Sequence, residues 1–275
     1  MKFDICMEMV LLDQPYEQRI RTVADCGFKA IEFWFHDATF TAADDPMSVP
    51  KDAAAIKQAC QANGVTVNNM VVNAPDGSHG GHLVKAEDLS LYLDRVEATI
   101  AFCKQIDCNK AITCTGNVIP GLSETQMRSN LEKALSEAAK IAQKHDFTLL
   151  LEPLNTHVNH AGYFLSSSRT SAEILRGINN PSLKLLFDIY HMQIMEGNLI
   201  DNISDEMDVI GHFHSAGVPG RHELTSGEIN YGAVIKAIAE GGYDGSFGLE
   251  YSPSIDDVAS LKEVRAFLSG LGVEK

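Results

Sequence analysis

Eight short apolar runs alternate with eight helical segments along the chain, and this alternation limits the fold more than any other feature. The apolar runs contain the β-branched and aromatic residues that strands favour, and glycine closes several of the helical segments. The predicted strands cover residues 3–11, 30–35, 65–72, 110–114, 147–152, 183–188, 208–214 and 247–250. The predicted helices end near residues 23, 62, 106, 145, 177, 207, 240 and 271. Such alternation implies parallel strands joined by right-handed crossovers.

The alternation predicts an α/β fold, a single (β/α)8 TIM barrel. A chain of 275 residues is long enough for one such barrel, and its composition does not change along its length. We therefore expect residues 1–275 to form one domain. A doubly wound open sheet is the alternative, but no G-x-G-x-x-G follows the first predicted strand.

The chain is acidic, with 22 Lys and Arg against 37 Asp and Glu and a formal net charge of −15. An acidic surface repels phosphate groups, so we expect no binding to nucleic acid or to anionic membranes. The N-terminus reads as a strand and no apolar stretch reaches the roughly 20 residues of a membrane span, which predicts a cytoplasmic protein. The six cysteines contain no C-x-x-C pair, and we expect buried free thiols.

Four consecutive predicted strands end on side chains that can bind a metal ion. These side chains are Glu152, Asp188, His214 and Glu250. The C-terminal ends of barrel strands form the catalytic face, so adjacent strands would bring the four side chains together. A single acidic residue at a strand end is often a helix cap or an ion-pair partner, but four in register are better explained by one site.

Three carboxylates and one imidazole suit one divalent metal ion. Mn²⁺, Mg²⁺ or Co²⁺ fits this donor set, with Zn²⁺ as the alternative, and the lack of thiolate ligands argues against a structural zinc. A six-coordinate ion held by four protein ligands keeps two positions for the oxygens of a substrate. The sequence therefore predicts a catalytic metal.

Other polar residues near these strand ends have two interpretations each. His191, three residues after Asp188, either contacts the substrate or forms a hydrogen bond within the loop. Arg221 follows a Gly-Val-Pro-Gly turn and either offers its planar fork of donors to the substrate or forms a surface ion pair. His212 points to the same side as His214 but one layer deeper, where a buried, hydrogen-bonded histidine is expected rather than a ligand.

Further residues of this kind lie outside the last four strands. Glu32, inside the second predicted strand, is either a buried polar wall or part of an ion pair within the barrel. Residues 33–35, Phe-Trp-Phe, either form an apolar wall that excludes water or pack in the barrel. His79 and His82 are expected in a loop or lid and not as ligands, and Glu228 is expected to cap a helix or form a pair near the eighth unit.

Four segments resemble the xylose-isomerase-like TIM-barrel superfamily. They are Glu-Pro-Leu-Asn at 152–155, Phe-Asp-Ile-Tyr-His at 187–191, His-Ser-Ala-Gly-Val-Pro-Gly-Arg-His-Glu at 214–223 and Gly-Leu-Glu-Tyr at 248–251. Within this superfamily, residues 218–223 and 227–231 are most similar to hydroxypyruvate isomerase and its relatives. The resemblance covers the whole barrel and is most specific from Glu152 onward.

The resemblance implies a metal site with an acid–base pair. The implied metal ligands are Glu152, Asp188, His214 and Glu250. Glu152 and Glu250 would also transfer the proton. His191 and Arg221 would contact oxygens of the substrate. Analogy with similar barrels predicts a homo-oligomer.

The implied function is isomerisation of a small hydroxy-carbonyl compound, of the hydroxypyruvate or short keto-sugar type, through an enediolate. The metal would stabilise the enediolate charge, and a metal-assisted hydride shift is the alternative mechanism. His214 stands where the hydroxypyruvate isomerases have glutamine, whereas the ketose 3-epimerases and inosose-type enzymes have histidine. A ketose 3-epimerase and a keto-inositol dehydratase are therefore alternatives. A DNA-repair phosphodiesterase and a non-catalytic sugar-binding barrel are the remaining ones, and the negative charge argues against the former.

Overall fold

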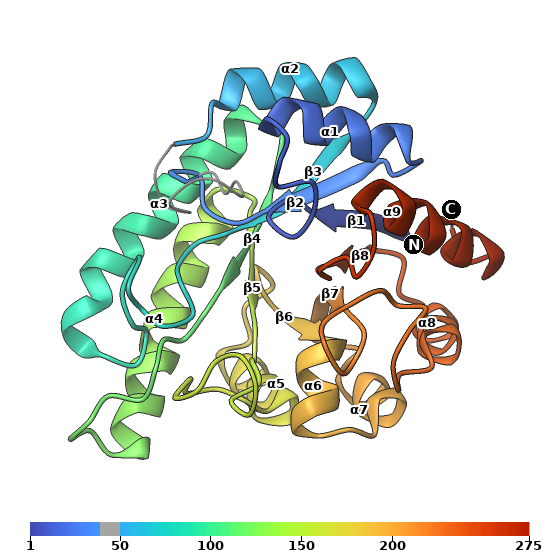
Figure 1. Ribbon diagram of the computed structural model, residues 1–275. Helices are drawn as coiled ribbons and strands as arrows, with labels where there is room; N and C mark the ends of the chain where they lie inside the picture. Colours follow the sequence, from blue (N-terminus) through green and yellow to red (C-terminus); the bar gives the residue numbers. More distant parts are fainter. Residues whose placement is uncertain (39–49, 275) are drawn as a thin grey trace.

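Eight parallel strands close into a barrel in which each strand pairs with the next and β8 pairs with β1 (Figure 1). The computed structural model describes residues 1–38 and 50–274. The strands are β1 Lys2–Cys6, β2 Ala30–Phe33, β3 Thr66–Val71, β4 Lys110–Thr113, β5 Thr148–Leu151, β6 Leu183–Asp188, β7 Ile210–Ser215 and β8 Ser246–Leu249. This topology confirms the predicted (β/α)8 TIM barrel.

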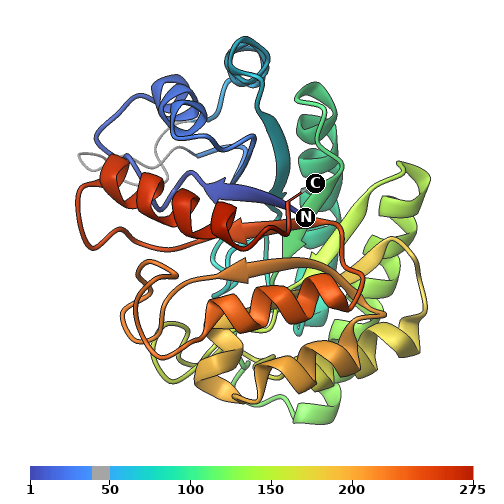
Figure 2. The same ribbon diagram turned by 90° about the vertical axis from the view of Figure 1, so that its right-hand side faces the viewer.

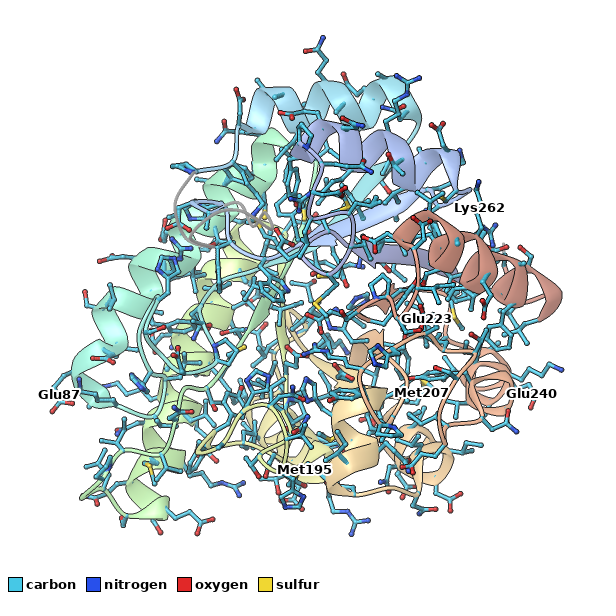
Figure 3. The ribbon with its side chains drawn as sticks, in the orientation of Figure 1. Glu87, Met195, Met207, Glu223, Glu240 and Lys262 are labelled. Carbon is cyan, nitrogen blue, oxygen red and sulfur yellow. The ribbon has the colours of Figure 1, made fainter. Side chains whose placement is uncertain are left out.

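Helices surround the barrel on its outside (Figure 2). Those in the described residues are α1 Tyr16–Asp25, α2 Ala53–Asn63, the 3₁₀ helix η1 Ala86–Asp88, α3 Leu89–Gln105, α4 Glu124–Lys144, α5 Ser168–Ile178, α6 Ile189–Met195, α7 Leu199–Glu206, α8 Tyr231–Glu240 and α9 Asp257–Gly270. Charged side chains such as Glu87, Glu240 and Lys262 are exposed at the periphery (Figure 3). The two ends of the described chain meet, because the N-terminal amine donates to the carbonyl of Val273 at 3.2 Å.

Side chains along each strand alternate between the helices and the barrel interior. On β5, Leu149 and Leu151 belong to the large core under the helices, whereas Leu150 lies in a separate small cluster. On β7, Phe213 packs against Phe247 of β8 with 6.0 Å between the ring centroids. Each residue that precedes or follows an outward-facing residue along a strand therefore faces the barrel interior. At the C-terminal ends of β5 to β8, these inward-facing side chains are polar.

Two parts of the described chain differ from the sequence prediction. The first predicted strand ends at Cys6, and residues 7–14 form turns although Met7, Val10 and Leu11 are buried. An additional helix, α6, begins directly after β6 because the Asp188 side chain accepts a hydrogen bond from the amide of His191 at 3.1 Å and caps it. His191 therefore lies in the first turn of a helix and not in a loop. A seven-residue helix is too short to show a clear apolar period in the sequence.

Six cysteines are buried and free, as predicted. Among residues 1–38 and 50–274, no helix is both long enough and apolar enough to cross a membrane.

Candidate active site

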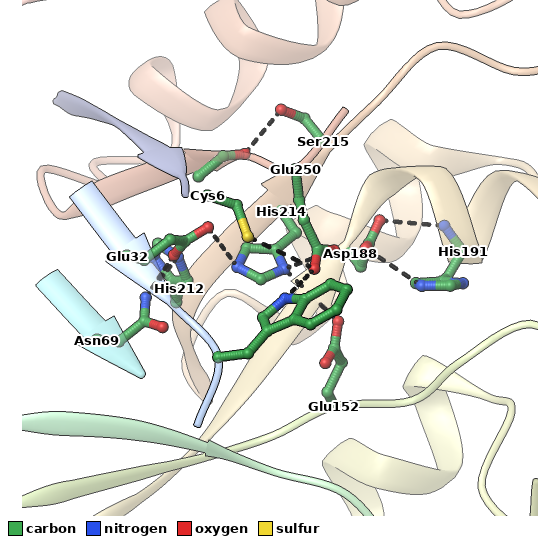
Figure 4. Close-up of polar contacts among 12 residues, drawn as sticks. Cys6, Glu32, Asn69, Glu152, Asp188, His191, His212, His214, Ser215 and Glu250 are labelled. Carbon is green, nitrogen blue, oxygen red and sulfur yellow. Dashed lines mark hydrogen bonds and ion pairs between the residues drawn. The ribbon is translucent and has the colours of Figure 1, made fainter. Parts of the chain in front are cut away.

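Four metal-capable side chains lie together at the C-terminal end of the barrel (Figure 4). Asp188 is the last residue of β6, and the strand register pairs it directly with His214 of β7. Glu152 and Glu250 each follow the last residue of a strand, β5 and β8. One candidate ligand atom from each of the four residues lies within 4.8 Å of the others, and all four are buried. The structure thus brings together the whole set that the sequence analysis selected.

Both glutamates approach the same nitrogen of His214. The distance from Nδ1 is 3.6 Å to Oε1 of Glu152 and 3.4 Å to Oε2 of Glu250. Nδ1 makes no well-directed hydrogen bond to any residue in the described part of the chain. Buried carboxylates repel one another unless a positive charge lies among them, and an unprotonated imidazole nitrogen is a good metal ligand. The donor set therefore fits one divalent cation.

The surroundings shift the pKa values of the three carboxylates in different directions. Burial raises the pKa of Glu152 to about 7 and that of Asp188 to about 6. Burial also acts on Glu250, but the charges of Arg221 and His214 outweigh it and hold the pKa of Glu250 well below its usual range. Burial opposes a charge on His214, but the surrounding carboxylates raise the pKa of this histidine well above 6.5. The metal-free cluster therefore holds protons that a bound cation would replace.

Arg221 belongs to the site and does not form a surface ion pair. Its Nη2 contacts Oε2 of Glu250, and its Nε donates to the Glu250 carbonyl at 3.2 Å. The guanidinium also lies over the ring of Tyr190, 5.3 Å from the ring centroid. Arg221 therefore fixes the position of Glu250 and keeps that carboxylate charged.

His191 is held in one tautomer by its neighbours. Its Nδ1 accepts hydrogen bonds from the amide nitrogen of Asn155 at 3.1 Å and from the side-chain Nδ2 of Asn155 at 2.6 Å. Burial lowers the pKa of His191 well below 6.5. The neutral ring must therefore carry its proton on Nε2, which lies 3.5 Å from Oδ2 of Asp188. The result is a fixed N–H donor at the edge of the cluster.

Trp34 and Asn155 are contributors that the sequence analysis did not identify. The sequence predicts Trp34 as part of an apolar wall or of the barrel packing, yet its indole Nε1 donates to Oε1 of Glu250 at 3.1 Å. Phe33 packs instead against Tyr16, with the ring centroids 5.9 Å apart. The position of Trp34 directly after β2 was the available signal, because strand ends face the site. Asn155 ends the Glu-Pro-Leu-Asn segment, but its contact with His191 depends on α6, a helix that the sequence does not predict.

The remaining histidines lie outside the four-residue cluster. His79 pairs with Asp37 at 3.1 Å, and His82 pairs with Asp88 at 3.2 Å. His212 lies one layer deeper, and its Nδ1 is 3.0 Å from the carbonyl oxygen of Ser246.

Glu32 and Glu228 each have a polar partner. Glu32 forms an ion pair with the imidazole of His214, which agrees with the second of its two interpretations, and its other oxygen lies 3.1 Å from Nε2 of His212. Glu228 accepts a hydrogen bond from Gln193 at 3.1 Å.

A cavity of about 570 Å³ adjoins the cluster, a volume within the range of small-molecule sites. Glu152, His191, Arg221 and Glu250 form part of its wall. Apolar side chains of Trp34, Phe35, Val71 and Leu154 and polar side chains of Asp76, Ser78, Asn117, Asn159 and His160 form much of the rest. Metal-capable groups, a fixed N–H donor and an arginine thus face a space large enough for a small polar molecule.

Comparison with known proteins identifies the family. A family model described as xylose isomerase-like TIM barrel matches residues 20–270. The hydroxypyruvate isomerase of Escherichia coli is 30% identical over 95% of this chain and 97% of its own length. The 2-oxo-tetronate isomerase of Cupriavidus necator is 27% identical over 97% of this chain and 98% of its own length.

Solved structures agree with this assignment. A family 2 AP endonuclease from Brucella melitensis superposes with a TM-score of 0.83 at 26% identity, covering 97% of this chain and 98% of that one. An L-ribulose 3-epimerase superposes with a TM-score of 0.79 at 20% identity, covering 99% and 95% of the two chains, which supports the fold alone. The match over nearly the full barrel and the relatives named as isomerases lead to one conclusion: the chain is an enzyme of the xylose isomerase-like TIM barrel family.

Proposed function

We propose that the protein is a divalent-metal-dependent isomerase of a small hydroxy-carbonyl compound, of the hydroxypyruvate or short keto-sugar type. The observation that carries this proposal is the pair of buried glutamates, Glu152 and Glu250, that meet at one nitrogen of His214 beside a cavity of about 570 Å³. The relatives named hydroxypyruvate isomerase and 2-oxo-tetronate isomerase support the same class of reaction.

Four residues would hold the metal in this proposal. They are Glu152, Asp188, His214 and Glu250. When bound, a divalent ion such as Mn²⁺, Mg²⁺ or Co²⁺ supplies Lewis-acid stabilisation of negative charge on the carbonyl side of the substrate.

The two glutamates would share the proton transfer. Arg221 and Trp34 stabilise the carboxylate form of Glu250, so Glu250 is suited to remove the proton α to the carbonyl. Arg221 pairs with Glu250 rather than with Glu152, so Glu152 is the one suited to take up a proton and return it to the neighbouring carbon. Two carboxylates whose surroundings separate their proton affinities are the usual arrangement for acid–base pairs.

Two further residues would orient the substrate. The Nε2–H of His191 is directed by Asn155 and can donate to a substrate oxygen. The guanidinium of Arg221 lines the same cavity and adds a charged donor close to Glu250. Trp34 and Phe35 line the cavity with apolar surface, which limits the access of water to the reacting carbons.

A ketose 3-epimerase is the second candidate. The cavity continues from the glutamates to the polar side chains of Asp76, Asn117 and Asn159, which could bind hydroxyl groups of a chain longer than three carbons. The same pair of glutamates would then work on opposite faces of one carbon, with one removing the proton and the other returning it. A keto-inositol dehydratase would use the same ligands and would differ in losing water.

Deuterium uptake tests the proposal and separates these candidates. The protein is loaded with Mn²⁺ or Co²⁺ and incubated in D₂O with hydroxypyruvate, tetruloses, fructose, psicose and keto-inositols, and products are followed by proton NMR. Enediolate chemistry is supported if the wild-type protein incorporates deuterium at the carbon α to a carbonyl and if both Glu152→Gln and Glu250→Gln fail to do so. The product then identifies the reaction. Glu206 is a buried glutamate of α7 that does not line the cavity, so Glu206→Gln is the control that should retain uptake. Metal-loaded protein that converts no member of the panel would refute the proposal.

A further inference from the structure

Beneath the candidate metal site, the barrel interior contains a further buried carboxylate, Glu32, with no role in the reaction proposed above. Glu32 lies in the middle of β2 and is 2% exposed. Its Oε1 is 3.0 Å from Nε2 of His214, the ring nitrogen opposite the one that faces Glu152 and Glu250. Figure 4 shows Glu32 on the far side of the His214 ring from Glu250. His214 therefore has Glu32 on its Nε2 side and Glu152 and Glu250 on its Nδ1 side.

The other oxygen of Glu32 is fixed by Asn69. Oε2 accepts a hydrogen bond from Nδ2 of Asn69 at 2.6 Å and lies 3.1 Å from Nε2 of His212. Because Oε2 is held in this way, Oε1 remains directed toward His214. The carboxylate cannot turn away from the His214 imidazole without breaking the hydrogen bond from Asn69.

Three adjacent buried atoms make no well-directed hydrogen bond within the described residues. They are Oε1 of Glu32 and both ring nitrogens of His214. A cation bound at Nδ1 of His214 would satisfy one of them, and a hydrogen bond from Nε2–H to Oε1 of Glu32 would satisfy the other two. The distance between Nε2 of His214 and Oε1 of Glu32 is already 3.0 Å, which is within the range of a hydrogen bond.

Gly248 of β8 provides the space for this arrangement. A Cβ atom at this position would lie 2.6 Å from Oε1 of Glu32, 2.7 Å from Cδ2 of His214 and 3.1 Å from Nε2 of His212. Gly248 is not among the glycines with a positive φ, so the reason for glycine is the lack of space and not the backbone conformation. Any larger side chain would separate Glu32 from His214.

We propose that Glu32 is a positioning residue that holds the proton of His214 on Nε2, so that Nδ1 is left unprotonated and directed at the divalent metal ion. This inference rests on the metal site of the proposed function and adds a residue that does not touch the ion. A carboxylate hydrogen-bonded to the outer nitrogen of a ligating histidine fixes the tautomer and the ring orientation, and its loss typically weakens metal binding about 10- to 100-fold.

The Glu32→Gln variant tests the role of the carboxylate with almost no change of shape. The amide oxygen of the new side chain is expected to face the donor of Asn69, which turns the NH₂ group toward Nε2 of His214. Nε2 would then act as an acceptor, and the ring proton would move to Nδ1, where it competes with the metal. We expect Co²⁺ affinity, measured by calorimetry, to fall about 10- to 100-fold. Glu206→Gln should leave it unchanged.

Proton NMR of the Co²⁺-loaded protein gives a readout independent of activity. The wild-type protein should show an exchangeable Nε2–H signal of a histidine bound through Nδ1, and this signal should be lost or exchange faster in Glu32→Gln. Coordination of His214 through Nε2 in the wild-type protein would overturn the inference even if the variant does not fold. Unchanged Co²⁺ affinity and an unchanged signal in the variant would also overturn it.

The outcomes separate this inference from the proposed function. Wild-type protein that does not bind Co²⁺ contradicts both. A second outcome is wild-type protein that binds Co²⁺ through Nδ1 and a Glu32→Gln variant that loses affinity as expected, while no substrate takes up deuterium. This outcome supports the role of Glu32 and refutes only the isomerase proposal.

Discussion

Glu152 and Glu250 are chemically identical, but replacing each with glutamine should change the stability of the metal-free protein in opposite directions. Glu152 is a buried carboxylate with two other carboxylates nearby, and its pKa is raised from 4.5 to about 7. Glu250 is paired with Arg221, which contacts both its side chain and its carbonyl. Removing the charge therefore relieves a cost at Glu152 and breaks an ion pair at Glu250.

The magnitude at Glu152 follows from its titration. A group with a raised pKa in the folded state contributes stability below its unfolded pKa, and this contribution is lost as the pH rises through the folded pKa. For Glu152 the loss occurs between about pH 4.5 and pH 7 and reaches about 3 kcal/mol at 1.36 kcal/mol per pH unit. Glutamine is neutral at every pH, so Glu152→Gln should stabilise the metal-free protein at pH 8 by up to that amount.

At Glu250 the sign is reversed. Glu250→Gln leaves the Arg221 side chain, only 17% exposed, without the carboxylate that contacts it. Breaking a buried ion pair on one side typically costs about 3–5 kcal/mol, and the lower end is expected because an amide oxygen can still accept from the guanidinium.

Urea unfolding at pH 8 in the presence of a chelator measures both effects, and equal m-values establish that the comparison is valid. Repeating the measurement at pH 5 provides the control, since the gain from Glu152→Gln should largely disappear there. Two variants that shift stability in the same direction, or a Glu152→Gln protein destabilised by more than about 1 kcal/mol, would refute the reasoning.

Three further predictions concern residues away from the cluster. Glu8 lies 2.9 Å from the Lys51 amine, so Lys51→Met leaves this buried carboxylate without its positive partner and should lower the free energy of unfolding in urea by about 3–5 kcal/mol. The double variant with Glu8→Gln should recover most of this loss. Equal stability of the single and double variants would contradict the prediction. Burial raises the pKa of Glu206 to about 7, so Glu206→Gln should stabilise the protein by about 2 kcal/mol at pH 8 and progressively less toward pH 5, measured as thermal unfolding midpoints. Ser123→Ala removes the capping box of α4 and should cost about 1 kcal/mol, while a loss below about 0.3 kcal/mol would indicate that Gln126 does not depend on the serine.

The sequence carried most of the information about the barrel because each strand and helix has a local signature. The apolar runs before Glu152 and Asp188 are buried on both faces, as parallel strands are, and the glycine of Asn63-Gly64 adopts the left-handed conformation at the end of α2. Their ends therefore fixed the positions of the candidate ligands. Helix α6 was missed because its start depends on the side chain of Asp188, which had been assigned a different role.

The contacts that distinguish the candidate ligands from one another could not be read from the sequence, because they join residues that only barrel closure brings together. Trp34 reaches Glu250 across 216 positions of the chain, and Glu32 reaches His212 across 180. Both contacts form because barrel closure brings the end of β2 close to β7 and β8, and no periodicity in the β2 sequence predicts this proximity.

Gly248 is an indirect mark in the sequence of the contact between Glu32 and His214. A glycine between two bulky residues of a predicted strand, as in Phe-Gly-Leu at 247–249, often marks a site where another group approaches the backbone closely. In this barrel that group is the carboxylate–imidazole pair of Glu32 and His214. If Glu32 controls the proton on His214, Gly248→Ala should lower Co²⁺ affinity as Glu32→Gln does, although residue 248 contributes no ligand. An unchanged affinity in a folded Gly248→Ala protein would show that the pair can separate without consequence for the metal site.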